Sequence, residues 1–110
     1  MNPIFYIKKG DRLPAITGTC RDGDGVVISL AGATVKFVMS RTPGGTPVVN
    51  AAAAVVAPAT GGRVTYAWAA IDTAVAGIYY AEFEVTFPGA LPLTFPSDKY
   101  ITVIIGTDLG

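Results

Sequence analysis

The clearest pattern in the chain is an alternation of apolar and polar residues from Ile78 to Phe87. A repeat of two residues is typical of a β-strand with one face in the core and the other in water. The preceding sequence "IDTAVAG" contains an aspartate and a glycine, and it must turn the chain into this strand. The face expected to be buried consists of Tyr79, Ala81, Phe83, Val85 and Phe87. The opposite face consists of Tyr80, Glu82, Glu84 and Thr86.

Shorter segments of the same kind predict further strands, separated by turns that contain glycine and proline. Residues 48–56 are ambiguous, because four alanines favour a helix whereas the valines and the flanking prolines favour a strand; we predict a strand. The Asp-Gly-Asp-Gly sequence at residues 22–25 is typical of a hairpin turn, and Ala31–Gly32 forms a second turn. The remaining predicted strands cover residues 4–8, 13–22, 33–41, 63–70, 93–95 and 99–105, with "PSD" at 96–98 interrupting the last two.

Seven or eight short strands without a convincing helix predict an all-β fold. We expect an immunoglobulin-like antiparallel β-sandwich of about seven or eight strands. The chain has 110 residues, which is enough for one core, so residues 1–110 are expected to form a single domain.

A tyrosine corner is a second sign of this fold. In immunoglobulin-like sandwiches, a tyrosine near the start of one strand bonds its hydroxyl to the backbone of the preceding connection. Asp72, Gly77 and Tyr79 fit such a corner, with Gly77 at the sharp turn and Asp72 capping free N–H groups. Trp68 is expected to pack beneath it. Antibody domains carry a cysteine two residues after this tyrosine, where this chain has Ala81, so we predict an Ig-like domain of another type.

The charge and the side-chain chemistry of the sequence argue against several classes of function. Eight Lys and Arg residues balance eight Asp and Glu residues, so nucleic-acid binding loses its usual electrostatic basis. The chain has no histidine and no visible nucleophile–base pair, so we expect no enzymatic activity, no metal and no cofactor. Its single cysteine, Cys20, cannot form an internal disulfide and is expected to be a buried, inert thiol.

The apolar content of the chain indicates a partner. Hydrophobic residues make up 51% of the sequence and charged residues only 15%, which is low for a small soluble domain. We therefore expect part of the apolar surface to be covered, either by copies of the chain or by another protein. The uncharged residues 42–62 contain too many prolines and glycines to span a membrane, and the N-terminus does not have the order of a signal peptide. Synthesis in the cytoplasm is expected.

Several residues could carry chemistry but have simpler explanations. Residues 22–25 contain half of the carboxylates of a calcium loop, yet no bidentate glutamate follows, so a plain turn is favoured. Glu82 and Glu84 share one strand face, whereas glycosidase carboxylates face each other across a cleft. The aromatic residues that could stack on a sugar have the parity of the core, and these are Tyr66, Trp68, Tyr79 and Phe83.

The chain resembles a known family in the order of its turns and core positions. The matching segments are "FYIKKGDRLP", "RDGDGVVISLAGATVKFVM", "GRVTYAW", "DTAVAGIYYAEFEVTF" and "TFPSDKYITVII". They resemble the N-terminal Ig-like domain of phage baseplate upper proteins and related small phage virion proteins, over Phe5 to Ile105. The resemblance implies a tail or baseplate component that is made in the host cytoplasm, resides in the virion and assembles into symmetric multimers. It implies no catalytic residues. The family's domain is followed by further chain, so with the sequence ending at Gly110 we expect a small structural or adaptor protein.

These observations lead to two hypotheses about contact residues. A structural virion protein would bind other virion proteins and its own copies, and we expect the flat alanine segment, with Ala53 and Ala54, and the outward Tyr80 to form the interface. The alternative is a carbohydrate- or cell-surface-binding Ig-like module. In that case Tyr80, Glu82 and Tyr100 would contact a host surface glycan.

Overall fold

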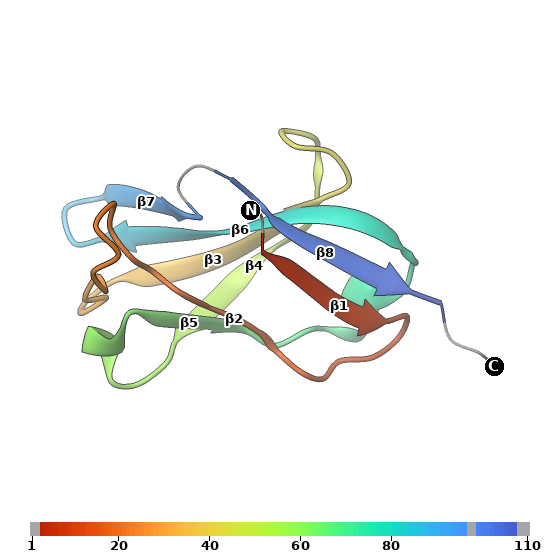
Figure 1. The fold of residues 1–110 in the computed structure, drawn as a ribbon, viewed down its shortest axis with the longest axis horizontal. Coiled ribbons are helices and arrows are strands. Elements are labelled where there is room, and N and C mark those ends of the chain that lie inside the picture. The colour runs from red at the N-terminus through yellow and green to blue at the C-terminus, as the bar shows by residue number, and fades with distance from the viewer. Residues whose placement is uncertain (1–2, 97–98, 108–110) are drawn as a thin grey trace.

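The computed structural model of the chain describes residues 3–96 and 99–107. This part of the chain forms eight strands and two short 3₁₀ helices (Figure 1), which confirms the all-β class and the predicted number of strands. The helices are η1 (Ala59–Gly61) and η2 (Ala70–Thr73). The strands are β1 (Ile4–Lys8), β2 (Ile16–Thr19), β3 (Thr34–Ser40), β4 (Pro47–Val55), β5 (Arg63–Tyr66), β6 (Gly77–Phe87), β7 (Leu91–Phe95) and β8 (Ile101–Gly106).

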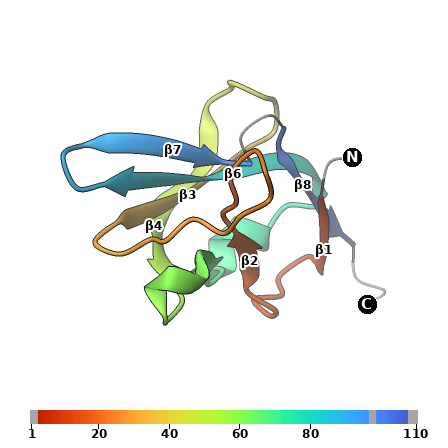
Figure 2. The same cartoon turned by 60° about the vertical axis from the view of Figure 1, so that its left-hand side comes forward.

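The strands form two layers that are joined through β4. Neighbouring strands follow the order β1-β8-β6-β3-β4-β5-β2, and β7 pairs with β6. Ala53 of β4 pairs with Val35 of β3, whereas the next residue, Ala54, pairs with Thr65 of β5. The strand therefore passes from the layer of β3, β6 and β8 to the layer of β5 and β2, as Figures 1 and 2 show.

One strand pair differs from the predicted antiparallel arrangement. β1 runs parallel to β8, in register from Ile4 opposite Thr102 to Lys8 opposite Gly106. Alternation in a sequence reports which side chains share a face but not the direction of the neighbouring strand, so the prediction was wrong for this pair. The other strand pairs between the described strands are antiparallel.

β6 is the longest strand and pairs with three others. Along one edge it pairs with β3. Along the other edge, residues 77–81 pair with β8 and residues 83–87 pair with β7. The return strand is thus divided in two, as the sequence predicts, although Ser97 and Asp98 of the predicted interruption lie outside the described residues.

Two predicted strands are shorter in the structure and one ambiguous segment is resolved. The predicted strand 13–22 is ordered only as β2, and the predicted strand 63–70 ends at Tyr66, before the chain enters η2. The ambiguous segment 48–56 is a strand, because β4 covers Pro47–Val55. Its alternate alanines, Ala51 and Ala53, pack against the core, where larger side chains would not fit as closely.

A single apolar core fills the space between the layers, and aromatic rings lie at its centre. The ring of Phe37 is 4.7 Å from that of Tyr66, 5.2 Å from Phe83 and 5.5 Å from Trp68. Each such pair adds about 0.5–1.5 kcal/mol beyond the burial of its surface. The four aromatics that could have stacked on a sugar are all buried in the core, as their parity predicts.

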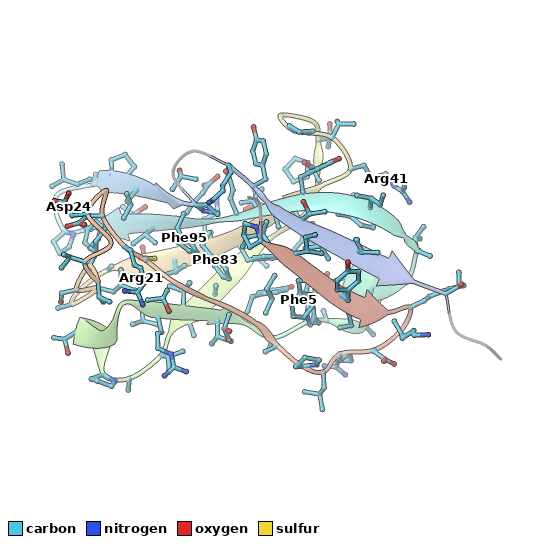
Figure 3. The ribbon with its side chains drawn as sticks, viewed as in Figure 1. Phe5, Arg21, Asp24, Arg41, Phe83 and Phe95 are labelled. Atoms are coloured by element: carbon cyan, nitrogen blue, oxygen red, sulfur yellow. The ribbon has the colours of Figure 1, made fainter. Side chains whose placement is uncertain are left out.

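The two layers close against each other at Gly18. A side chain at this position of β2 would place its Cβ 2.7 Å from the ring of Phe95 on β7. Figure 3 shows Phe95 and Phe83 pointing from the upper layer into the interior. Glycine at residue 18 therefore lets the β7 end of one sheet approach the β2 edge of the other, and the sandwich is nearly closed.

Candidate interaction surfaces

The connection before β6 forms a tyrosine corner. The hydroxyl of Tyr79 donates a hydrogen bond of 2.7 Å to the carbonyl oxygen of Val75, as expected for this corner. Gly77 has a φ of 154°, which a residue with a side chain rarely adopts. The guanidinium of Arg41 lies over the Tyr79 ring, 4.9 Å from its centre. The corner fixes the entry of β6 into the sheet.

Asp72 caps the connection but does not contact Tyr79. Its carboxylate accepts hydrogen bonds from the backbone N–H of Ala69 at 2.8 Å and from the hydroxyl of Tyr66 at 2.5 Å. The capping role is the expected one, and the bond to Tyr66 adds a link from η2 to the core. Burial, and secondly the hydrogen bond to Asp72, raises the pKa of Tyr66, which favours the protonated hydroxyl that donates this bond.

Trp68 packs in the core beside the corner connection. Its ring contacts those of Phe5, Phe37 and Tyr66 at centroid distances between 5.5 and 5.8 Å. Its carbonyl oxygen accepts a hydrogen bond from Nε of Arg12. Trp68 therefore links β1, β3 and β5 and is a structural residue.

The Asp-Gly-Asp-Gly sequence forms a turn that uses its own carboxylate. Oδ1 of Asp22 accepts hydrogen bonds from the backbone N–H groups of Asp24 at 2.9 Å and Val26 at 3.0 Å, and the N–H of Gly25 closes the turn. Within residues 3–96 and 99–107, no three His, Cys, Asp or Glu residues lie close enough to hold a metal ion. The arrangement agrees with the turn that the sequence favours.

The acidic pair and the thiol lie in different environments. Glu82 and Glu84 are half-buried on the outer face of β6, where Lys36 of β3 is directly opposite Glu84. Burial, and secondly the charge of Glu84, raises the pKa of Glu82. Cys20 is completely buried, and burial raises the pKa of its thiol, which disfavours the reactive thiolate.

The candidate interface residues from the sequence do not share one surface. Ala53 is opposite Val35, so it faces the core, and this placement corrects the expectation that it is available to a neighbour. Ala54 is exposed, but its strand is already paired with β5 there. Tyr80 lies on the outer face of β6, half-buried, with its ring in edge contact with Tyr100.

An exposed apolar face on β1, β8 and β6 was not predicted. Ile78 of β6 is opposite Ile104 of β8, which is opposite Tyr6 of β1, so these three side chains form one row across the outer surface. Tyr6 is 67% exposed and Ile78 is 56% exposed. Both parities of "IFYIK" and "ITVII" are largely apolar, so alternation could not tell which side chains point outward. The apolar residues on both parities were themselves a signal, because a strand with water on one face is expected to carry polar side chains on that face.

The hollows on the surface of the described residues include three that border the candidate residues or the strand edges. One of about 270 Å³ is bordered by Tyr6, Lys8, Ile104 and Gly106 on the apolar face. One of about 90 Å³ is lined in part by Tyr80, Glu82 and Tyr100. The third, of about 570 Å³, lies between the ends of β1, β2 and β7 and is lined in part by Ile4, Thr19, Arg21 and Phe95.

Two further observations bear on the class of protein. None of the helices in the described part of the chain has the length and hydropathy needed to span a bilayer. Comparison of the chain with protein-family models, with curated proteins and with solved structures found no match.

Proposed function

We propose that the chain is a phage virion structural protein, an Ig-like adaptor or decoration component of the tail, baseplate, neck or capsid. It acts through protein–protein contacts with other virion proteins and with its own copies. The resemblance of its turn and core segments to phage baseplate Ig-like domains, over Phe5 to Ile105, carries this proposal. The role requires no catalytic residues.

The exposed apolar face supports a role in assembly. Large apolar patches on a soluble domain mark sites that another molecule covers. The row of Tyr6, Ile104 and Ile78 crosses three neighbouring strands, so its side chains form a continuous surface instead of isolated contacts. A zero net charge also leaves little electrostatic repulsion between copies.

The composition of purified particles tests the proposal. Mass spectrometry of gradient-purified virions should detect the protein at a fixed ratio to the major tail or capsid protein. Immunogold labelling with negative-stain imaging should place it at one location on the particle. If the protein is present in the lysate but absent from mature particles, it is not a virion component.

The alternative proposal is a carbohydrate-binding module, and one observation favours it. The three contact residues proposed from the sequence, Tyr80, Glu82 and Tyr100, do border one hollow. Its volume of about 90 Å³ is well below the roughly 300 Å³ at which small-molecule pockets begin, so a sugar could only lie on its surface. Specific binding on a glycan array that is lost in Tyr80→Ala would favour this alternative over the assembly role.

A further inference from the structure

We infer that the outer face of β1, β8 and β6 binds the same face of a second copy of this chain, about a two-fold axis that runs along β8. The inference gives the proposed assembly function a surface and a partner, and it rests on that function for its biological meaning. It is argued from the symmetry of the face, its charge, its shape and its area.

The apolar face is arranged symmetrically about β8. Neighbouring strands are about 4.8 Å apart, so Tyr6 and Ile78 lie at equal distances on either side of Ile104. A two-fold axis along β8 exchanges the positions of β1 and β6. Ile104 then faces Ile104 of the other copy, and Tyr6 of each copy faces Ile78 of the other. Two-fold interfaces require such self-complementarity.

The next row repeats the arrangement one step along the strands. Ile4 of β1 is opposite Thr102 of β8, which is opposite Tyr80 of β6. Ile4 is 52% exposed. The same axis places Ile4 of each copy on Tyr80 of the other, so this row also pairs one aliphatic with one aromatic side chain.

Charged residues lie at the ends of the face and not within the two rows. Lys8 follows Tyr6 on β1, and Glu82 follows Tyr80 on β6, in opposite directions along the sheet. An apolar centre with charges at the rim is the usual anatomy of a protein interface. No charge within the two rows has to lose its hydration when two such faces meet.

A hollow on the face matches a projecting side chain. The hollow of about 270 Å³ is bordered by Tyr6, Lys8, Ile104 and Gly106, and the absence of a side chain at Gly106 keeps it open. The axis brings Ile78 of the second copy over this hollow. Because Ile78 stands 56% exposed on its own copy, it can enter the hollow without a rearrangement of the sheet.

The area of the face fits a dimer of modest affinity. A half-exposed large side chain offers on the order of 100 Å², about half of what an aromatic residue buries in full. Three side chains, Ile4, Tyr6 and Ile78, are exposed to this extent and give roughly 300 Å² per copy, and the less exposed Ile104 and Tyr80 add roughly 100 Å². The pair therefore buries about 800 Å², an area in the range of weak, transient interfaces. The dimer is therefore expected to dissociate in the micromolar range.

The experiment measures the mass of the whole chain in solution by analytical ultracentrifugation between about 1 and 200 µM, the range in which such an equilibrium is visible. The unmodified chain should shift from the monomer to twice its mass. Ile78→Glu should weaken the dimer by about 30-fold or more, as expected for a residue at the centre of an interface. The matched control is Ile71→Glu, on η2 outside this face, where the isoleucine is 82% exposed; it should leave the dimer unchanged. Thermal melts of both variants check that they are folded.

A cross-link tests the position of the axis independently of any loss of folding. In Ile104→Cys, the introduced thiols of two copies should face each other across the axis. Because face-to-face sheets pack about 10 Å apart, which is too far for a direct disulfide, a short bis-maleimide should cross-link them, while Ile71→Cys should not be cross-linked. Cys20 is completely buried and does not compete. A chain that stays monomeric at the highest concentration, an Ile78→Glu dimer of unchanged affinity, or a dimer that Ile104→Cys does not cross-link would each overturn the inference. A monomer that is still present in purified particles would overturn the dimer and leave the virion role intact.

Discussion

Removing the hydroxyl of Tyr79 tests the tyrosine corner with the smallest possible change. In Tyr79→Phe the ring keeps its place in the core and its contact with Arg41, and only the 2.7 Å bond to the carbonyl oxygen of Val75 is lost. An acceptor left without a partner costs about 1–3 kcal/mol when water cannot reach it. Val75 is 57% exposed, so water can replace part of the bond, and we expect the low end, about 1 kcal/mol.

The neighbouring tyrosine supplies the control. Tyr80→Phe removes a hydroxyl that has no hydrogen-bond partner among the described residues, while the edge contact of its ring with Tyr100 remains. Urea unfolding can be followed by the fluorescence of Trp68, the only tryptophan, which is buried. A loss of 1 kcal/mol should lower the urea midpoint of Tyr79→Phe by roughly 0.7–1 M and leave that of Tyr80→Phe unchanged. Equal midpoints for the two variants would show that the corner bond does not stabilise the fold.

Three further predictions concern single side chains. Gly77→Ala should cost about 1–2 kcal/mol in thermal or urea unfolding, because its φ of 154° strains any side chain and the new Cβ would lie 3.1 Å from the Arg41 guanidinium; a neutral result would contradict the need for glycine. The raised pKa of Glu82 means that the folded chain holds this proton more tightly than the unfolded chain, so stability falls as pH rises from the ordinary value of 4.5 through the raised one. Glu82→Gln should therefore melt above the parent at pH 7 and together with it below about pH 4, and identical melts at both pH values would refute this. Ala53→Glu should destabilise the fold by about 2 kcal/mol or more, because the charge enters the core side, whereas the exposed Ala54→Glu should change it by less than about 0.5 kcal/mol; calorimetry of the pair decides.

Local pattern was sufficient to predict the strands and the corner. The alternation in β6 reports burial directly, and its residues from Tyr79 to Val85 on the apolar parity are buried. The corner was recognisable because Asp72, Gly77 and Tyr79 each have a physical role that few other residue types can fill. The turn at residues 22–25 could also be predicted from the sequence, because the carboxylate of Asp22 accepts hydrogen bonds from backbone groups only two and four residues later.

Features that depend on contacts between distant segments could not be predicted. The parallel direction of β1 depends on its pairing with β8, about a hundred residues later, and no local signal encodes it. The alanines of β4 read alike in the sequence, but Ala53 faces the core because it is opposite Val35. The outer apolar face could not be predicted because it too depends on contacts between distant segments. When both parities of a short strand are apolar, only the packing of the whole domain decides which side chains point outward.

The parallel pairing of β1 and β8 also determines how the domain responds to mechanical force. The chain enters the domain at Ile4, opposite Thr102, and leaves it at Gly106, opposite Lys8 (Figure 1). Tension between the two ends of the chain therefore pulls these strands past each other along their length. The backbone hydrogen bonds between them carry the load together and are not opened one at a time from an end. A domain built in this way resists extension through its termini more strongly than one whose terminal strands are separated one bond at a time.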